Sequence, residues 1–159
     1  MKITDNFKYQ GLRKKLAIDL ERKGITNKIV LSAIENIPRH FFVDAGLLDL
    51  AYLDQALPIG DKQTISQPYT VAFQSSLLDV CPNDKILEIG TGSGYQAAIL
   101  SHMKAQVYTI ERQRSLFRKT KDLLLNTGYN VIMFYGDGYK GLPKLAPFDK
   151  IIITAAAPE

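Results

Sequence analysis

The chain has 159 residues and a mass of 17.8 kDa, a length typical of one domain. Hydrophobic residues make up 46% and charged residues 23%, a balance that excludes an intrinsically disordered chain. The net charge of +4 is too small to indicate nucleic acid by itself. Because Cys81 is the single cysteine, no intramolecular disulfide can form. We therefore expect a reducing, cytoplasmic location, with neither a signal peptide nor a membrane span.

Residues 1–80 form a helical region followed by a substrate loop in our interpretation. Leucines at every fourth position predict a helix over residues 12–20. A similar apolar stripe predicts a second helix over 29–37, and a proline opens a third over 68–78. Residues 40–66 have no clean period, so we expect an irregular loop with short turns there.

Residues 81–159 alternate between short apolar runs and amphipathic segments. The runs predict strands over 85–89, 106–110, 131–135 and 150–154, separated by helices over 95–103 and 112–127. Such alternation is typical of an α/β fold, a doubly wound, mainly parallel sheet with helices on both faces. We expect a Rossmann-like core over 81–159, preceded by the helical region, with both segments in one structural domain.

A glycine-rich turn joins the first predicted strand to its helix. Gly90, Gly92 and Gly94 let the backbone turn sharply and approach a ligand closely. Glu111 ends the next strand 21 residues after Gly90, the position of a carboxylate that binds ribose hydroxyls. Asp137 ends the third strand between two glycines. These acids are expected at the edge where open α/β sheets bind ligands.

The spacing around this turn distinguishes between two nucleoside cofactors. A dinucleotide fingerprint, G-x-G-x-x-G, would need glycine where this chain has Tyr95. Glu88 precedes the turn, and a carboxylate there would repel a pyrophosphate but attract a sulfonium. We therefore favour S-adenosylmethionine over NAD. The alternative is that Glu88 faces solvent and the glycines form only a tight turn.

Longer segments carry a family resemblance. ILEIGTGSGYQAAIL resembles the first motif of class I S-adenosylmethionine-dependent methyltransferases. Together with IPRHFFVD, LPIGDKQTISQPYTVA and GDGYKGLPKLAPFDKIIITAAAPE, it resembles the protein-L-isoaspartate O-methyltransferase family over about residues 31–159. The resemblance implies methyl transfer to the free carboxylate of L-isoaspartyl and D-aspartyl residues in damaged proteins. The ester then collapses to a succinimide, which starts repair, and the partners are isoaspartyl-containing proteins and peptides.

The resemblance also implies roles for individual residues. Ser66 is the catalytic hydroxyl, and Thr64, Ser66 and Gln67 bind the substrate. The implied cofactor-binding residues are Glu88, Gly90, Thr91, Gly92, Ser93, Gly94, Glu111, Arg112, Asp137 and Gly138. We expect no metal site.

Simpler interpretations remain open for several residues. Ser66 lies two residues before a proline and could cap the helix that follows. His40 and His102 are isolated packing or surface residues, and Cys81 is inert, in our interpretation. The basic run over 112–121 is typical of a solvated helix face, so nucleic acid is not expected as a partner. The alternatives to isoaspartyl methylation are a class I methyltransferase acting on RNA or a small molecule, or a truncated cofactor-binding fragment without activity.

Two features depart from the family pattern. The family usually has glycine where this chain has Lys62, and a positive φ there would cost lysine about 1 kcal/mol. The family also continues beyond the fourth strand with further elements, so we expect the C-terminal strands to be missing here. The uncovered strand over residues 150–154 would then offer an edge for self-association.

Overall fold

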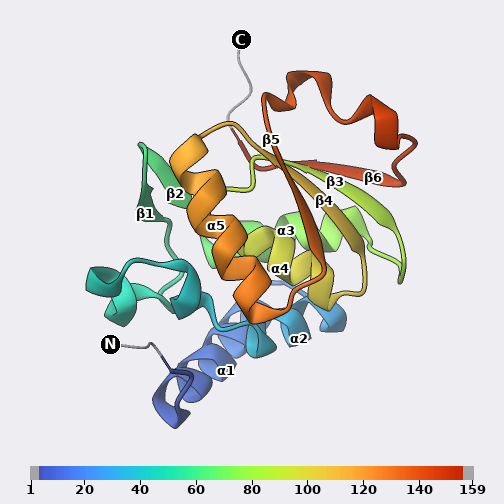
Figure 1. Ribbon diagram of the computed structural model, residues 1–159. Helices are drawn as coiled ribbons and strands as arrows, with labels where there is room; N and C mark the ends of the chain where they lie inside the picture. The colour runs from blue at the N-terminus through green and yellow to red at the C-terminus, as the bar shows by residue number, and fades with distance from the viewer. Residues whose placement is uncertain (1–3, 156–159) are drawn as a thin grey trace.

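A four-stranded parallel sheet lies at the centre of the molecule, in the order β5-β4-β3-β6 (Figure 1). The computed structural model describes residues 4–155. The strands are β3 (Lys85–Ile89), β4 (Gln106–Glu111), β5 (Val131–Tyr135) and β6 (Lys150–Ile153). Every neighbouring pair is parallel, with Glu88 opposite Thr109 on β4 and Ile152 on β6. All four carboxyl ends therefore meet at one edge of the sheet.

Different elements pack against the two faces of the sheet. The strands β3, β4 and β5 follow one another in one direction, so right-handed crossovers bring α4 (Tyr95–His102) and α5 (Arg114–Thr127) to the same face. On the other face, the β5–β6 connection places Phe148 against Tyr108, with ring centroids 5.7 Å apart. The expected doubly wound fold is confirmed. In the described chain, short 3₁₀ turns rather than an α-helix cover this second face (Figure 1).

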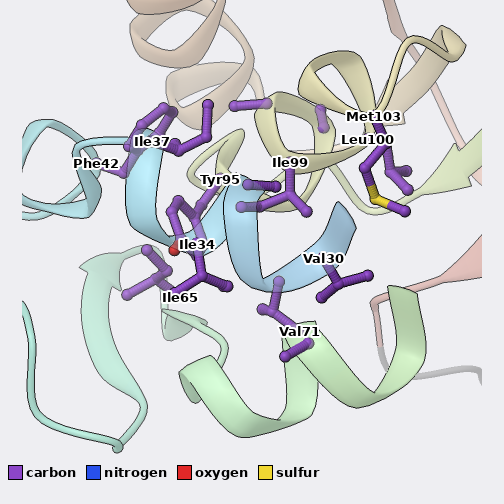
Figure 2. Packing of buried hydrophobic residues seen from close by; sticks show 14 of the residues in the cluster. Val30, Ile34, Ile37, Phe42, Ile65, Val71, Tyr95, Ile99, Leu100 and Met103 are labelled. Atoms are coloured by element: carbon purple, nitrogen blue, oxygen red, sulfur yellow. The ribbon is translucent and has the colours of Figure 1, made fainter. Parts of the chain in front are cut away.

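Three helices precede the sheet, α1 (Phe7–Arg22), α2 (Lys28–Asn36) and α3 (Pro68–Leu78). The side chains of Asn6 and Asn27 cap the first two helices by accepting backbone N–H groups. Figure 2 shows the apolar side chains of α2, α3 and α4 packed against one another. One cluster of buried residues runs from Leu16 to Ile152 and so includes both halves of the chain.

The stretch expected to be an irregular loop contains more structure than its sequence indicates. A hairpin of β1 (Leu57–Gly60) and β2 (Gln63–Ile65) follows 3₁₀ turns at Arg39–Phe42 and Ala45–Leu50. Its strands have only four and three residues, too few for a period to stand out. The turn also lacks the Asn-Gly or Asp-Gly pair that marks a two-residue hairpin loop.

The hairpin turn has left-handed backbone at two residues that are not glycine. Asp61 has φ of 49° and Lys62 has φ of 56°. Paired left-handed residues match the twist of a two-residue hairpin, and glycine is the residue usually found at the second position. A lysine in this region is strained by its Cβ, as expected where the family usually has glycine.

Replacing Lys62 with glycine should stabilise the protein. Lys62→Gly removes a Cβ strain of about 1 kcal/mol, which corresponds to a melting temperature about 2–4 °C higher for a chain of this size. Lys62→Ala is the matched control, since it removes the long side chain but keeps the Cβ. A rise in melting temperature of equal size in both variants would contradict the backbone explanation.

Candidate functional site

A cavity of about 360 Å³ lies at the carboxyl ends of the parallel strands. We call it the outer cavity. Aliphatic side chains of Ile89, Ile110 and Ile153 form its apolar wall. Six of the residues predicted to bind the cofactor line it: Gly90, Gly92, Glu111, Arg112, Asp137 and Gly138. The structure therefore brings these six predicted residues together at one edge of the sheet.

The glycine turn is held tightly between β6 and α5. Gly90 has φ of 98°, and a Cβ at this position would lie 2.6 Å from the Cβ of Ala155. The hydroxyl of Thr154 donates to the Gly90 carbonyl at 2.6 Å, and the hydroxyl of Thr120 donates to the Gly92 carbonyl at 2.6 Å. Glycine is required at position 90 both by the dihedral angle and by this close approach.

Two carboxyl groups are fixed in the outer cavity by backbone N–H groups. Glu111 is 5% exposed, and its two oxygens accept from Gly92 N and Gln113 N, each at 2.8 Å. Asp137 accepts from Tyr139 N at 3.0 Å through Oδ1. Each carboxylate oxygen has two lone pairs, so both groups keep acceptor capacity for a ligand such as a ribose diol.

Glu88 does not share this cavity. Successive side chains of a strand point to opposite faces, so Ile89 faces the outer cavity while Glu88 faces α4. Glu88 is completely buried, which also excludes the interpretation that it faces solvent. Burial raises the pKa of Glu88 to about 8, although a hydrogen bond from Thr109 opposes this shift. Glu88 therefore does not line the outer cavity, and its raised pKa weakens the negative charge that the expected attraction to a sulfonium requires.

A second, smaller cavity of about 30 Å³ lies behind the glycine turn, and we call it the inner chamber. Its lining includes five of the predicted residues that are absent from the outer cavity: Thr64, Ser66, Glu88, Thr91 and Ser93. Gly90 and Thr154 line both cavities, so the two compartments meet at the glycine turn. Two predicted residues, Gln67 and Gly94, line neither cavity.

The interpretation of Ser66 as a helix cap is wrong. The N-cap of α3 is Gln67, and no hydrogen bond from its own side chain caps the helix. Asp54 takes over this function, since its Oδ1 accepts from Tyr69 N at 2.8 Å. The Ser66 hydroxyl is thereby left free of a capping role and lies at the inner chamber.

Arg39 fixes the backbone at Ser66. Its guanidinium is completely buried and donates to the carbonyls of Ala51 at 2.5 Å, Gln55 at 3.2 Å and Ser66 at 3.1 Å. It also lies over the ring of Tyr95, 5.7 Å from the centroid. Sequence reasoning missed this residue, because nothing in IPRHFFVD indicates where its side chain points.

Several other lining residues of the outer cavity were missed. They are Gln63, Gln113, Tyr139, Thr154 and Ala155. Three of them are adjacent to a predicted site residue, whereas Thr154 ends the strand predicted over 150–154 and Ala155 follows it. Extending the motifs to these neighbouring positions would have found them.

His40 and Cys81 lie outside both cavities. His40 is buried, its Nδ1 is 2.6 Å from the Tyr52 hydroxyl, and its ring stacks on Tyr9 at 3.9 Å. Burial lowers the pKa of His40. Cys81 is exposed.

Within residues 4–155, no group of three or more His, Cys, Asp or Glu side chains could hold a metal ion. In the same range, no helix is both long and apolar enough to cross a membrane.

Comparison with known proteins agrees with this geometry. A family model described as protein-L-isoaspartate(D-aspartate) O-methyltransferase matches residues 11–159. Protein-L-isoaspartate O-methyltransferases from Christiangramia forsetii and Flavobacterium johnsoniae are 56% and 59% identical to this chain. These matches cover 99% and 98% of this chain, respectively, and 74% of each relative.

Solved methyltransferase structures share the fold of this chain. A protein-L-isoaspartate O-methyltransferase superposes with a TM-score of 0.81 at 32% identity, over 89% of this chain and 47% of that one. A methyltransferase from Plasmodium falciparum, solved with S-adenosyl-L-homocysteine, has a TM-score of 0.77 at 23% identity over 92% of this chain and 75% of that one. The second likeness shows the fold alone. By the family match and these identities, the chain belongs to the protein-L-isoaspartate(D-aspartate) O-methyltransferase family, whose enzymes depend on S-adenosylmethionine.

Proposed function

We propose that this chain transfers a methyl group to the free carboxylate of L-isoaspartyl and D-aspartyl residues in damaged proteins, using the outer cavity for the cofactor and Ser66 for the substrate. The methyl ester then collapses to a succinimide, which reopens partly to normal aspartate. The observation that carries the proposal is the contact between the two compartments. Gly90 and Thr154 line both, so a cofactor in one would end beside a substrate group held at the other.

The outer cavity fits the cofactor in size and in its donor set. Its volume of about 360 Å³ lies within the range of about 300–1,000 Å³ usual for small-molecule sites. We assign the ribose diol to Glu111, which two backbone N–H groups hold in place, and the adenosine end of the cavity to Asp137 and Gly138. S-adenosylmethionine supplies an electrophilic methyl group on a sulfonium.

The charge of the lining supports a cationic ligand over a pyrophosphate. Glu111 and Asp137 contribute two carboxylates, and Arg112 is the one basic side chain in the described lining. A net negative cavity attracts a sulfonium and an ammonium and repels phosphate groups. The electrostatic argument first made for Glu88 therefore applies to Glu111 and Asp137 instead.

Methylation of a carboxylate needs little acid–base chemistry from the protein. The nucleophile has an unperturbed pKa of about 4 and is ionised at neutral pH, so no general base is required. The protein must instead hold the carboxylate in line with the methyl group and exclude water. Such orientation can contribute about 7–11 kcal/mol to lowering the barrier.

Ser66 is suited to hold the substrate carboxylate. A hydroxyl donates a hydrogen bond without a full positive charge, which would blunt the nucleophile. Arg39 fixes the Ser66 carbonyl, and Thr64, on β2 of the hairpin, lines the same chamber. We assign Gln67 a supporting contact to the peptide, since it follows Ser66 outside both cavities.

Removing the Ser66 hydroxyl should reduce turnover more than cofactor affinity. A hydrogen bond to a charged group contributes about 1.5–3 kcal/mol, so Ser66→Ala should lower kcat by about 10- to 100-fold. Labelled methyl transfer to an isoaspartyl peptide measures turnover, and calorimetry with S-adenosylhomocysteine measures affinity. Ser76→Ala on α3 is the control, because its hydroxyl donates only to the Ala72 carbonyl. Equal losses of turnover and affinity in Ser66→Ala would refute a substrate role.

Neutralising Asp137 should weaken cofactor binding. Asp137→Asn keeps an oxygen for Tyr139 N but loses the charge, so the Kd for S-adenosylhomocysteine should rise by about tenfold. The exposed Asp122 on α5 provides a control of the same chemistry, Asp122→Asn. An unchanged Kd in Asp137→Asn would remove Asp137 from the cofactor site.

Action on RNA or a small molecule is a weaker alternative. The family match and the named relatives favour the isoaspartyl substrate. The loop after β6, Thr154 to Pro158, offers no acidic or amide acceptor for an exocyclic amine, although residues 156–159 lie outside the described chain. Methyl transfer to tRNA in place of the peptide would support the alternative.

We further propose that the protein acts in the cytoplasm and that β6 pairs with a second copy. A single exposed thiol, Cys81, is compatible with a reducing compartment. β6 has one strand partner in the described sheet, and Ile151 and Ile153 are 57% and 55% exposed. Exposed apolar edge strands favour pairing with another chain.

Sedimentation at increasing concentration tests this pairing. We expect a concentration-dependent dimer that Ile151→Lys weakens, because a charged side chain opposes strand pairing. Ile132→Lys on β5 is the control, since Ile132 is similarly exposed at 47%. A monomer at every concentration would refute the dimer.

A further inference from the structure

The inner chamber contains buried polar atoms without protein partners. Among the described residues, Glu88 Oε1, Gln96 Oε1 and Tyr95 OH are each buried and form no hydrogen bond. All three side chains line the chamber. Buried polar groups are almost always hydrogen-bonded, either to protein or to ordered water. The chamber volume of about 30 Å³ exceeds the roughly 10–15 Å³ that a cavity needs to hold a water molecule.

The hydrogen bonds already present fix the roles of the two Glu88 oxygens. Thr109 Oγ1 donates to Glu88 Oε2 at 2.6 Å, and Thr109 Oγ1 is itself 2.7 Å from Thr91 Oγ1. Oε2 therefore acts as an acceptor. On the neighbouring helix, Gln96 Nε2 donates to Ser75 Oγ at 2.8 Å, which leaves Gln96 Oε1 as an acceptor without a protein donor.

We propose that one ordered water molecule fills the inner chamber and that Glu88, as a neutral hydrogen-bond donor, is a positioning residue that directs this water toward Ser66. Glu88 donates to the water through Oε1, and the water donates to Gln96 Oε1 and to the Ser66 oxygen. The Ser66 O–H then points away from the chamber and is free to donate to the substrate carboxylate. The proposal rests on the proposed function of Ser66.

The surroundings keep Glu88 protonated. From β4, Thr109 donates to it and the nearby charge is that of Glu111, another acid. From α4, it faces Tyr95, whose pKa is also raised by burial, and the neutral Gln96. The residues that reach the chamber from α3 and from the end of β6, Val71 and Thr154, do not titrate. Desolvation therefore dominates, and the pKa of Glu88 rises to about 8.

Loss of the Glu88 proton would change which groups the water donates its hydrogen bonds to. An ionised Glu88 offers only acceptors, so the water must donate to both Glu88 and Gln96 and has no hydrogen left for Ser66. The Ser66 hydroxyl would then donate into the chamber and turn away from the substrate. Ionisation of Glu88 thus lowers turnover without touching the outer cavity.

The protonation of Glu88 can be tested without cofactor or substrate. A folded state that keeps a proton which the unfolded chain has released loses stability as the pH rises. The melting temperature of the wild type should therefore fall relative to Glu88→Gln between about pH 5 and about pH 8. Glu35→Gln, at an exposed carboxylate, should follow the wild type. Parallel wild-type and Glu88→Gln curves would overturn the proposal.

The positioning role is tested by the pH profile of methyl transfer to an isoaspartyl peptide. We expect wild-type kcat/KM for the peptide to fall about tenfold per pH unit above about pH 8, and Glu88→Gln to lack this decline. Glu88→Ala should be impaired at every pH, with activity partly rescued in Glu88→Gln. A decline of equal steepness in wild type and Glu88→Gln would overturn the role of Glu88.

Cofactor affinity separates this proposal from direct binding by Glu88. If Glu88→Gln raises the Kd for S-adenosylhomocysteine by about tenfold, the size of a lost charged hydrogen bond, Glu88 is a cofactor ligand and the proposal is overturned. An unchanged Kd with an altered pH profile supports it. Absence of transfer by the wild type would refute the proposed function and with it the role at Ser66, whereas the melting curves report on the chamber alone.

Discussion

The alternation of side chains along β3 divides the site into two compartments. Ile89 faces the outer cavity and Glu88 faces the inner chamber, because neighbouring residues of a strand point to opposite faces. The glycine turn that follows β3 is then the wall between them. Its close approach to Ala155 and its hydrogen bond from Thr154 keep this wall thin. The two compartments therefore lie directly next to each other, with Gly90 and Thr154 lining both.

Two acids at this edge of the sheet lie in different surroundings. Glu111 accepts two backbone N–H groups and lines an open cavity. Glu88 has one hydroxyl partner and no solvent contact, and burial raises its pKa. Environment rather than residue type therefore shifts the protonation of Glu88.

The N-terminal region has a direct part in the site. Arg39 ties its own 3₁₀ turn to the Ser66 carbonyl, and Asp54 caps α3 in place of a local side chain. The Asp54 side chain also pairs with Lys23 at 2.5 Å, at the end of α1. The segment that holds Ser66 is thus anchored by residues up to 43 positions away in sequence. A loop fixed in this way loses little freedom when a substrate binds.

The strands, the glycine turn and the positions of Glu111 and Asp137 could be predicted from the sequence alone. These depend on local period and spacing, which a linear sequence carries directly. The β1–β2 hairpin, the contacts of Arg39 and the burial of Glu88 became visible only in the folded chain. A three-residue strand has no readable period, and a guanidinium or carboxyl group has its partners set by elements distant in the chain. The desolvation of Glu88 depends on which helix covers β3, and that is settled by packing rather than by neighbouring residues.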